Sequence, residues 1–65
     1  KFTERFNECL KQTELKQTEI AKYCHIAKQT ITNFKSGRAY PSIDTLFLLC
    51  KVLDVSADYL LGLED

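Results

Sequence analysis

Apolar residues recur at helical spacing in five short segments of this chain, and no segment alternates apolar and polar residues with the period of a strand. The segments cover residues 2–12, 17–24, 28–36, 43–53 and 57–61. The connections between them are short, so consecutive helices are expected to pack as neighbours around one core. The 65 residues therefore predict one all-α domain over residues 1–65, with little core to spare for an internal catalytic cleft.

Residues typical of helix ends mark the borders of the last three segments. Gly37 follows the third segment, where a helix often ends in a left-handed conformation. Pro41 stops any helix running through the loop, and Ser42 can then cap the fourth helix. Ser56 is expected to cap the fifth helix, which Gly62 ends.

The fourth segment carries the broadest apolar surface. Its main stripe consists of Leu46, Leu49, Cys50 and Leu53, with Ile43 and Phe47 beside it. The run is bounded by capping residues, which favours a buried helix over an aggregation-prone strand.

The cysteines do not form a pattern that binds metal. Cys9, Cys24 and Cys50 contain no CxxC pair, and the single histidine, His25, directly follows Cys24. All three cysteines fall at apolar-periodic positions, so we expect reduced thiols packed in the core and no metal. The sequence also has no glycine-rich phosphate loop and no nucleophile–base–acid set. We therefore expect no enzyme, no cofactor and no small-molecule ligand.

The net charge of zero conceals an uneven distribution. Residues 15–40 hold five Lys or Arg against one Glu, a net charge of +4, whereas residues 41–65 hold one Lys against five Asp or Glu, a net charge of −4. A basic middle suits a polyanion bound on one face, although solvated charge clusters are also common. No apolar run approaches the roughly 18 residues that span a bilayer, and the start lacks the apolar core of a signal peptide. We expect a cytoplasmic protein without a membrane segment.

The third segment, "KQTITNFKSG", has two unlike faces. At about 100° per residue, Ile31 and Phe34 point one way, with Ala27 beside them. The opposite arc carries Lys28, Gln29, Thr32 and Asn33, together with Ser36. Gln and Asn can pair with adenine, Lys donates to guanine, and Thr offers a hydroxyl and a methyl group to thymine. This arc is either a base-reading surface or an ordinary solvated face.

The order of these features resembles the phage-repressor, or Xre-type (Cro/C1-type), helix-turn-helix family. The matching positions are Leu15, Gln17, Ile20, Ala21, Ile26, Ile31, Phe34, Gly37, Pro41, Ser42, Leu46 and Leu49, followed by "VSADYLLG". The resemblance implies a five-helix lambda-repressor-like domain whose helix-turn-helix covers about residues 17–36. It also implies that the helix over 28–36 enters the major groove.

The resemblance assigns DNA contacts residue by residue. The base-reading residues would be Lys28, Gln29, Thr32 and Asn33. The phosphate-binding residues would be Lys16, Gln17, Lys35, Ser36, Arg38 and Tyr40. Two of the phosphate residues have a structural alternative, since Tyr40 can pack against Pro41 and Ser36 can cap the end of the helix.

The chain departs from the family pattern at five positions, two of which are Leu10 and Lys35, where many relatives carry an Arg and an acidic residue that pair. The family usually has Gly where His25 stands and Ser or Thr where Ala27 stands. Lys16 replaces a common capping hydroxyl, and its charge opposes the dipole of the second helix. We expect Lys16 to lie where a DNA phosphate binds.

The implied function is a sequence-specific duplex-DNA-binding transcriptional repressor that acts as a homodimer on a palindromic operator. The dimer contact would involve Val55, Tyr59, Leu60, Leu61 and Leu63. Leu63 can alternatively pack back on the first helix. An antitoxin-type DNA binder is a variant of this function. A protein-bridging module, suited by its acidic end to a basic partner, is the alternative from another class.

Overall fold

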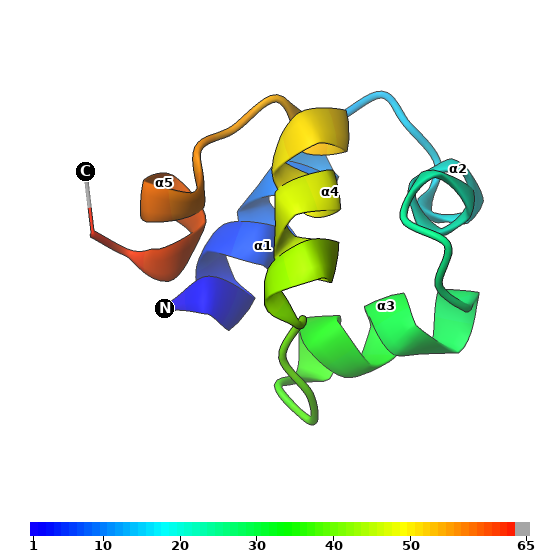
Figure 1. Ribbon diagram of the computed structural model, residues 1–65, viewed down its shortest axis with the longest axis horizontal. Helices are drawn as coiled ribbons and strands as arrows, with labels where there is room; N and C mark the ends of the chain where they lie inside the picture. The colour runs from blue at the N-terminus through cyan, green and yellow to red at the C-terminus, as the bar shows by residue number, and fades with distance from the viewer. Residues whose placement is uncertain (64–65) are drawn as a thin grey trace.

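The computed structural model describes residues 1–63 and contains five helices and no strand in that range (Figure 1). The helices are α1 (Phe2–Gln12), α2 (Gln17–Tyr23), α3 (Lys28–Ser36), α4 (Ile43–Leu53) and α5 (Ala57–Leu61). The predicted all-α fold is confirmed, and α2 ends one residue earlier than the periodicity indicates. Glu64 and Asp65, which contribute to the acidic end of the sequence, lie outside the described residues.

The predicted capping residues occupy the helix ends. Ser42 Oγ accepts a hydrogen bond from the Thr45 amide at 3.2 Å, which satisfies a free donor in the first turn of α4. Ser56 Oγ accepts from the Tyr59 amide at 3.0 Å and does the same for α5. Gly37 follows α3 with a φ of +80°, a backbone conformation that glycine adopts without strain.

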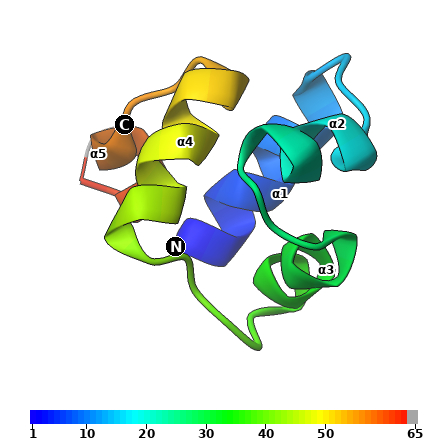
Figure 2. The same ribbon diagram turned by 45° about the vertical axis from the view of Figure 1, so that its right-hand side comes forward.

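The core lies where α1 meets the other helices. It consists of Phe2, Phe6, Cys9, Ile20, Ala21, Cys24, Ile31, Phe34, Leu49 and Leu60. Phe34 of α3 meets the rings of Phe2 and Phe6 edge-on, with centroids 6.3 and 6.0 Å apart. Such edge-to-face contacts are favourable between aromatic rings and attach α3 to α1. The α2–α3 pair lies on one side of α1 and α4, and α5 lies on the other (Figure 1; Figure 2).

Two apolar residues of α4 are exposed, contrary to the expectation of a broad buried face. Ile43 is 86% exposed and Phe47 is 60% exposed, whereas Leu49 is fully buried. At about 100° per residue, Phe47 points roughly 160° away from Leu49, so the core cannot cover both. The Lys51 ammonium lies 5.5 Å from the centroid of the Phe47 ring and partly shields that ring.

The three cysteines are free thiols that belong to the core or pack against it. Cys9 and Cys24 are buried, and Cys50 is partly buried. Burial raises the pKa of the Cys24 thiol above its ordinary value. The packing role predicted for the cysteines is therefore confirmed. No helix in residues 1–63 has the length and apolar character needed to cross a membrane.

Candidate nucleic-acid interface

Helix α3 has the two faces that its sequence predicts. Ile31 is fully buried and Phe34 is 3% exposed. On the other side, Lys28, Gln29 and Thr32 are exposed and Asn33 is partly exposed. The helix begins after Ala27, which makes no side-chain capping bond, and ends at Gly37. The structure therefore brings all four predicted base-reading side chains together on one short helix.

Local hydrogen bonds hold part of this face in order. Gln29 Nε2 donates to Asn33 Oδ1 at 3.2 Å, a pairing between residues one helical turn apart. Thr32 Oγ1 donates to the Lys28 carbonyl at 3.4 Å. Each amide side chain has two donor protons and two acceptor lone pairs, so the Gln29–Asn33 bond leaves capacity for a further partner. The arrangement can read the edge of a base with little loss of side-chain freedom.

The predicted phosphate residues lie around the ends of α2 and α3. Lys16, Ser36, Arg38 and Tyr40 are exposed, and Gln17 and Lys35 are partly buried. Ser36 Oγ donates to the Asn33 carbonyl at 3.1 Å, the helix-end role named as its alternative. The Tyr40 ring packs edge-on against Phe2 at 6.1 Å between centroids, yet Tyr40 remains 69% exposed.

The start of α2 is capped by Glu19, a contact that was not predicted from the sequence. Lys16 occupies the capping position, and its ammonium cannot accept a hydrogen bond. Glu19 instead reaches back, and its Oε1 accepts from the Lys16 amide at 2.8 Å. A Glu three residues after a cap is a recognised signal, so the sequence already contained this contact. The carboxylate also offsets the unfavourable Lys16 charge at this end of the helix.

The turn between α2 and α3 passes through the left-handed region. His25 has a φ of +57°, which explains why glycine is common at this position in the family that the sequence resembles. The Ile26 amide then donates to the Ala21 carbonyl at 3.0 Å and closes the turn. Ile26 packs against the core from the turn. These contacts hold α3 in a defined orientation beneath α2.

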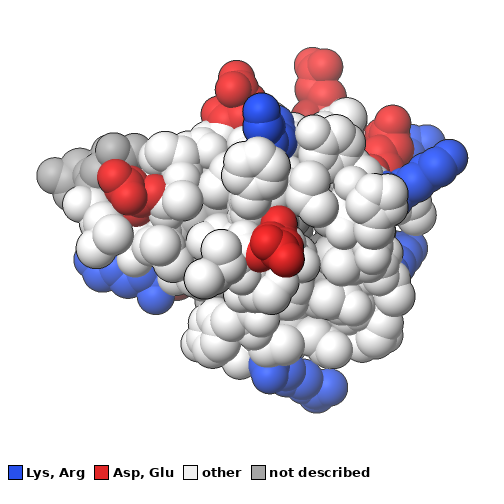
Figure 3. Space-filling view, viewed as in Figure 1, with Lys and Arg blue, Asp and Glu red and all other residues white. Residues whose placement is uncertain are grey.

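The surface near α3 is basic, and within residues 1–63 no salt bridge involves a lysine or arginine of α3. Helix α3 contains no acidic residue. An ion pair joins the N-terminal amine to Glu4, 3.8 Å apart and far along the chain from α3. Figure 3 shows that the face over α4 is mostly uncharged, with acidic atoms near its middle and along its upper edge and basic atoms at its lower edge. Free cations at the ends of α3 suit an anionic partner.

The predicted dimer residues differ in exposure. Leu60 is fully buried in the core of the single chain. Val55 and Tyr59 are partly buried. Leu61 is 48% exposed and Leu63 is 74% exposed, so Leu63 does not pack back on α1. The exposed apolar surface at this end of the chain thus belongs to Leu61 and Leu63.

Comparisons with known proteins agree with this geometry. The family described as Helix-turn-helix matches residues 7–60. The chain is 37% identical over 60 residues to YqaE of Bacillus subtilis, and 31% identical over 64 residues to YobD of the same organism. Both are named uncharacterized HTH-type transcriptional regulators. These matches cover 92% and 98% of the chain but 52% and 57% of the relatives, so the chain spans about half of their length.

A solved structure has the same fold. It is the crystal structure of a transcriptional regulator from Listeria innocua, which superposes with a TM-score of 0.86 and 28% sequence identity. The superposition covers the whole of this chain and 61% of the other.

Proposed function

Because the chain belongs to the helix-turn-helix family, we propose that it binds duplex DNA and regulates transcription, with α3 in the major groove. One observation carries the proposal. Helix α3 buries Ile31 and Phe34 and turns a row of polar and basic side chains to solvent. The family consists of DNA-binding regulators without catalytic activity, so we assign no reaction to the chain.

The side chains on the exposed face of α3 are proposed to contact different bases. Gln29 and Asn33 are one helical turn apart and have the amide chemistry that pairs with adenine. Lys28 and Thr32 extend the row and can meet guanine and thymine. Base contacts of this kind supply sequence preference.

Phosphate contacts supply most of the affinity and fix the register on the duplex. Arg38 and Tyr40 are exposed just after α3, and Lys16 is exposed at the start of α2. Gln17 and Ser36, together with the Lys35 ammonium, complete the proposed set. The N-terminal amides of a helix favour an anion, which suits a phosphate at the start of α2.

We further propose that the protein acts as a homodimeric repressor on a palindromic operator. One recognition helix contacts too few base pairs to select a genomic site, and a two-fold dimer doubles the sequence that is read. The exposed Leu61 and Leu63 support a contact through the end of α5. A dimer bound over a promoter would prevent transcription. We place this activity in the cytoplasm, where free thiols such as those of this chain persist.

Selection from a random pool of duplex DNA tests the proposal. The protein is titrated into the labelled pool at several salt concentrations, binding is followed by fluorescence anisotropy, and the bound fraction is sequenced. We expect enrichment of an inverted repeat and a log–log dependence of affinity on salt with a steep negative slope. Failure to bind DNA even at low salt would reject the proposal and favour the alternative, a protein-bridging module.

Sedimentation velocity in the presence of the selected operator tests the dimer. Replacing Leu61 and Leu63 together by serine should leave a single chain on the operator at protein concentrations where the wild type binds as two. The matched control replaces Ile43 and Phe47 by serine, because this is a second exposed apolar pair at another end of the molecule. Dimer loss in the control alone would move the contact to α4.

A further inference from the structure

The C-terminal end of α3 is held by a residue from another helix. The last carbonyl groups of a helix lack partners within that helix. At the end of α3, the amides of Arg38 and Gly37 donate to the carbonyls of Asn33 and Phe34, at 3.0 and 3.3 Å. The Lys35 carbonyl has a different partner. It accepts a hydrogen bond from Asn7 Nδ2 of α1, at 3.0 Å.

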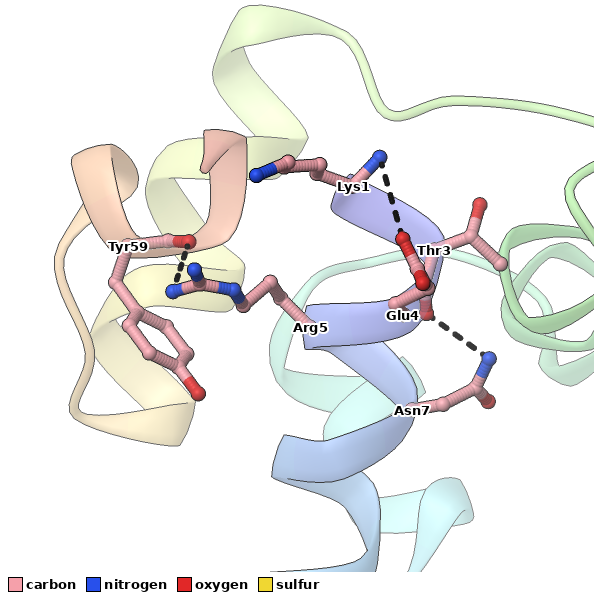
Figure 4. Close-up of polar contacts among 6 residues, drawn as sticks. All are labelled: Lys1, Thr3, Glu4, Arg5, Asn7 and Tyr59. Carbon is pink, nitrogen blue, oxygen red and sulfur yellow. Dashed lines mark hydrogen bonds and ion pairs between the residues drawn. The ribbon is translucent and has the colours of Figure 1, made fainter. Parts of the chain in front are cut away.

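Both protons of the Asn7 amide are used. The same Nδ2 donates to the Thr3 carbonyl at 2.9 Å, one turn earlier in α1 (Figure 4). An amide nitrogen has two protons, so one holds the side chain against its own helix while the other reaches α3. In Figure 4 the Asn7 side chain extends away from α5 and Tyr59. The side chain is partly buried, which weakens competition from water.

This bond constrains what the neighbouring contacts leave free. Edge-on ring contacts of Phe34 with Phe2 and Phe6 also join α1 to α3. Apolar packing is non-directional, whereas a hydrogen bond requires a distance and an angle. The Asn7 bond therefore adds a directional constraint on where the C-terminal end of α3 lies relative to α1.

We infer that Asn7 is a positioning residue for base recognition: its amide fixes the end of α3 and thereby sets where Gln29 and Asn33 meet the base pairs. The inference rests on the proposed DNA binding. Base contacts demand accurate placement of a short side chain, while long lysine and arginine side chains adjust to a phosphate. Loss of the Asn7 amide should therefore reduce sequence discrimination more than total affinity.

Two substitutions remove the amide donor in different ways. Asn7→Ala deletes the side chain, and alanine is the best helix former, so part of the lost stability is restored. Asn7→Asp keeps the size but presents only acceptors to two carbonyl oxygens. Ser56→Ala is the matched control, because it removes a side-chain hydrogen bond that holds a helix end, at the start of α5 and away from α3. Thermal unfolding of all three variants checks that each is folded at the assay temperature.

The probes are a duplex carrying one half-site of the sequence that the wild-type protein enriches, and a random duplex of equal length. For both Asn7 variants, affinity for the half-site should fall about tenfold, the discrimination carried by one base contact. Affinity for the random duplex and its salt dependence should change less than about twofold, since phosphate contacts remain. Ser56→Ala should leave the ratio of the two affinities unchanged.

Three results would overturn the inference. The ratio of the two affinities could stay constant in the Asn7 variants, or Ser56→Ala could lower it as much at an equal loss of melting temperature. If the wild-type protein enriched no sequence at all, the proposed function would fail first and the inference with it. That failure is seen before any variant is made, so the two are distinguishable.

Discussion

The guanidinium group of Arg5 lies over the ring of Tyr59, with its central carbon 4.5 Å from the ring centroid. Arg5 Nη1 also donates to the Tyr59 carbonyl at 3.4 Å (Figure 4). Tyr59 Oη in turn donates to a carboxylate oxygen of Glu8 at 3.4 Å. Helix α5 has five residues, and so short a helix has little stability of its own. Contacts with α1 such as this one therefore hold α5 in place.

Arg5→Ala should lower the free energy of unfolding by about 1–2 kcal/mol, since it removes a cation–π contact and a hydrogen bond together. Urea denaturation of Arg5→Ala, Tyr59→Leu and the double variant measures the coupling between the two side chains. Arg5→Lys should give an intermediate loss, because lysine keeps the charge but not the planar group. Additive effects of the two single substitutions would contradict the ring contact.

His25→Gly should raise the free energy of unfolding by about 1 kcal/mol. His25 adopts a left-handed backbone conformation, which is strained for a residue with a Cβ atom and unstrained for glycine. Asp54, with a φ of +56°, offers a parallel case, and Asp54→Gly should stabilise less because aspartate tolerates this region. Urea denaturation measures both.

Gly37→Ala, which replaces a glycine of positive φ at the end of α3, is the control for the two glycine substitutions. Gly37 has a φ of +80°, and a methyl group there would lie 3.6 Å from Thr3 Oγ1, an ordinary contact distance. Gly37→Ala should therefore destabilise through backbone strain and not through a clash. A gain of stability in Gly37→Ala would refute the argument from φ for all three positions.

Much of the fold follows from local sequence signals. The periodicity of apolar residues predicts all five helices, and serine or glycine marks the end of α3, the start of α4 and both ends of α5, because these signals act within a few residues. The two faces of α3 are predicted as well, with Ile31 and Phe34 inside. The Glu19 contact to the Lys16 amide was equally local and was available from the spacing alone.

The missed features depend on tertiary packing. The exposure of Phe47 depends on which side of α4 meets the other helices, and an apolar stripe does not say where its edge is covered. The bond from Asn7 to the Lys35 carbonyl joins residues 28 positions apart, and no local pattern marks it. Whether Leu63 packs back on α1 was equally open until α5 was placed against α1.

Stability should fall at alkaline pH as the buried thiols begin to ionise. Burial raises the pKa of the Cys24 thiol, so the folded state holds this proton at pH values where the unfolded chain releases it. The stabilising contribution is full below the unfolded pKa and is lost as the pH rises through the folded pKa. Urea denaturation from neutral to alkaline pH should show a shallower decline for Cys24→Ala than for the wild type. Parallel curves would exclude a Cys24 contribution.

Base and phosphate contacts should separate in mutant binding data. Gln29→Ala should relax the sequence preference at one or two positions of each half-site, because its amide is proposed to pair with a base. Arg38→Ala should weaken binding to all sequences and lower the salt slope by about 1, because it removes one phosphate contact. Selection from the random pool with each variant measures the first effect, and anisotropy against salt measures the second. The proposed roles fail if the two variants behave alike.

Lys16→Thr should raise stability and weaken DNA binding at once. A threonine hydroxyl can accept from the Glu19 amide and complete a capping box with the existing Glu19 contact, a gain of about 1 kcal/mol. The substitution also removes a positive charge from the start of α2. DNA affinity should fall, with a salt slope lower by about 1, because a phosphate loses its partner.

Lys22→Thr is the control for Lys16→Thr. It makes the same charge change on an exposed lysine in the last turn of α2, where the loss of charge should slightly destabilise the helix and leave DNA binding unaltered. Thermal unfolding and anisotropy titrations measure both effects, and unchanged binding by Lys16→Thr would remove Lys16 from the interface.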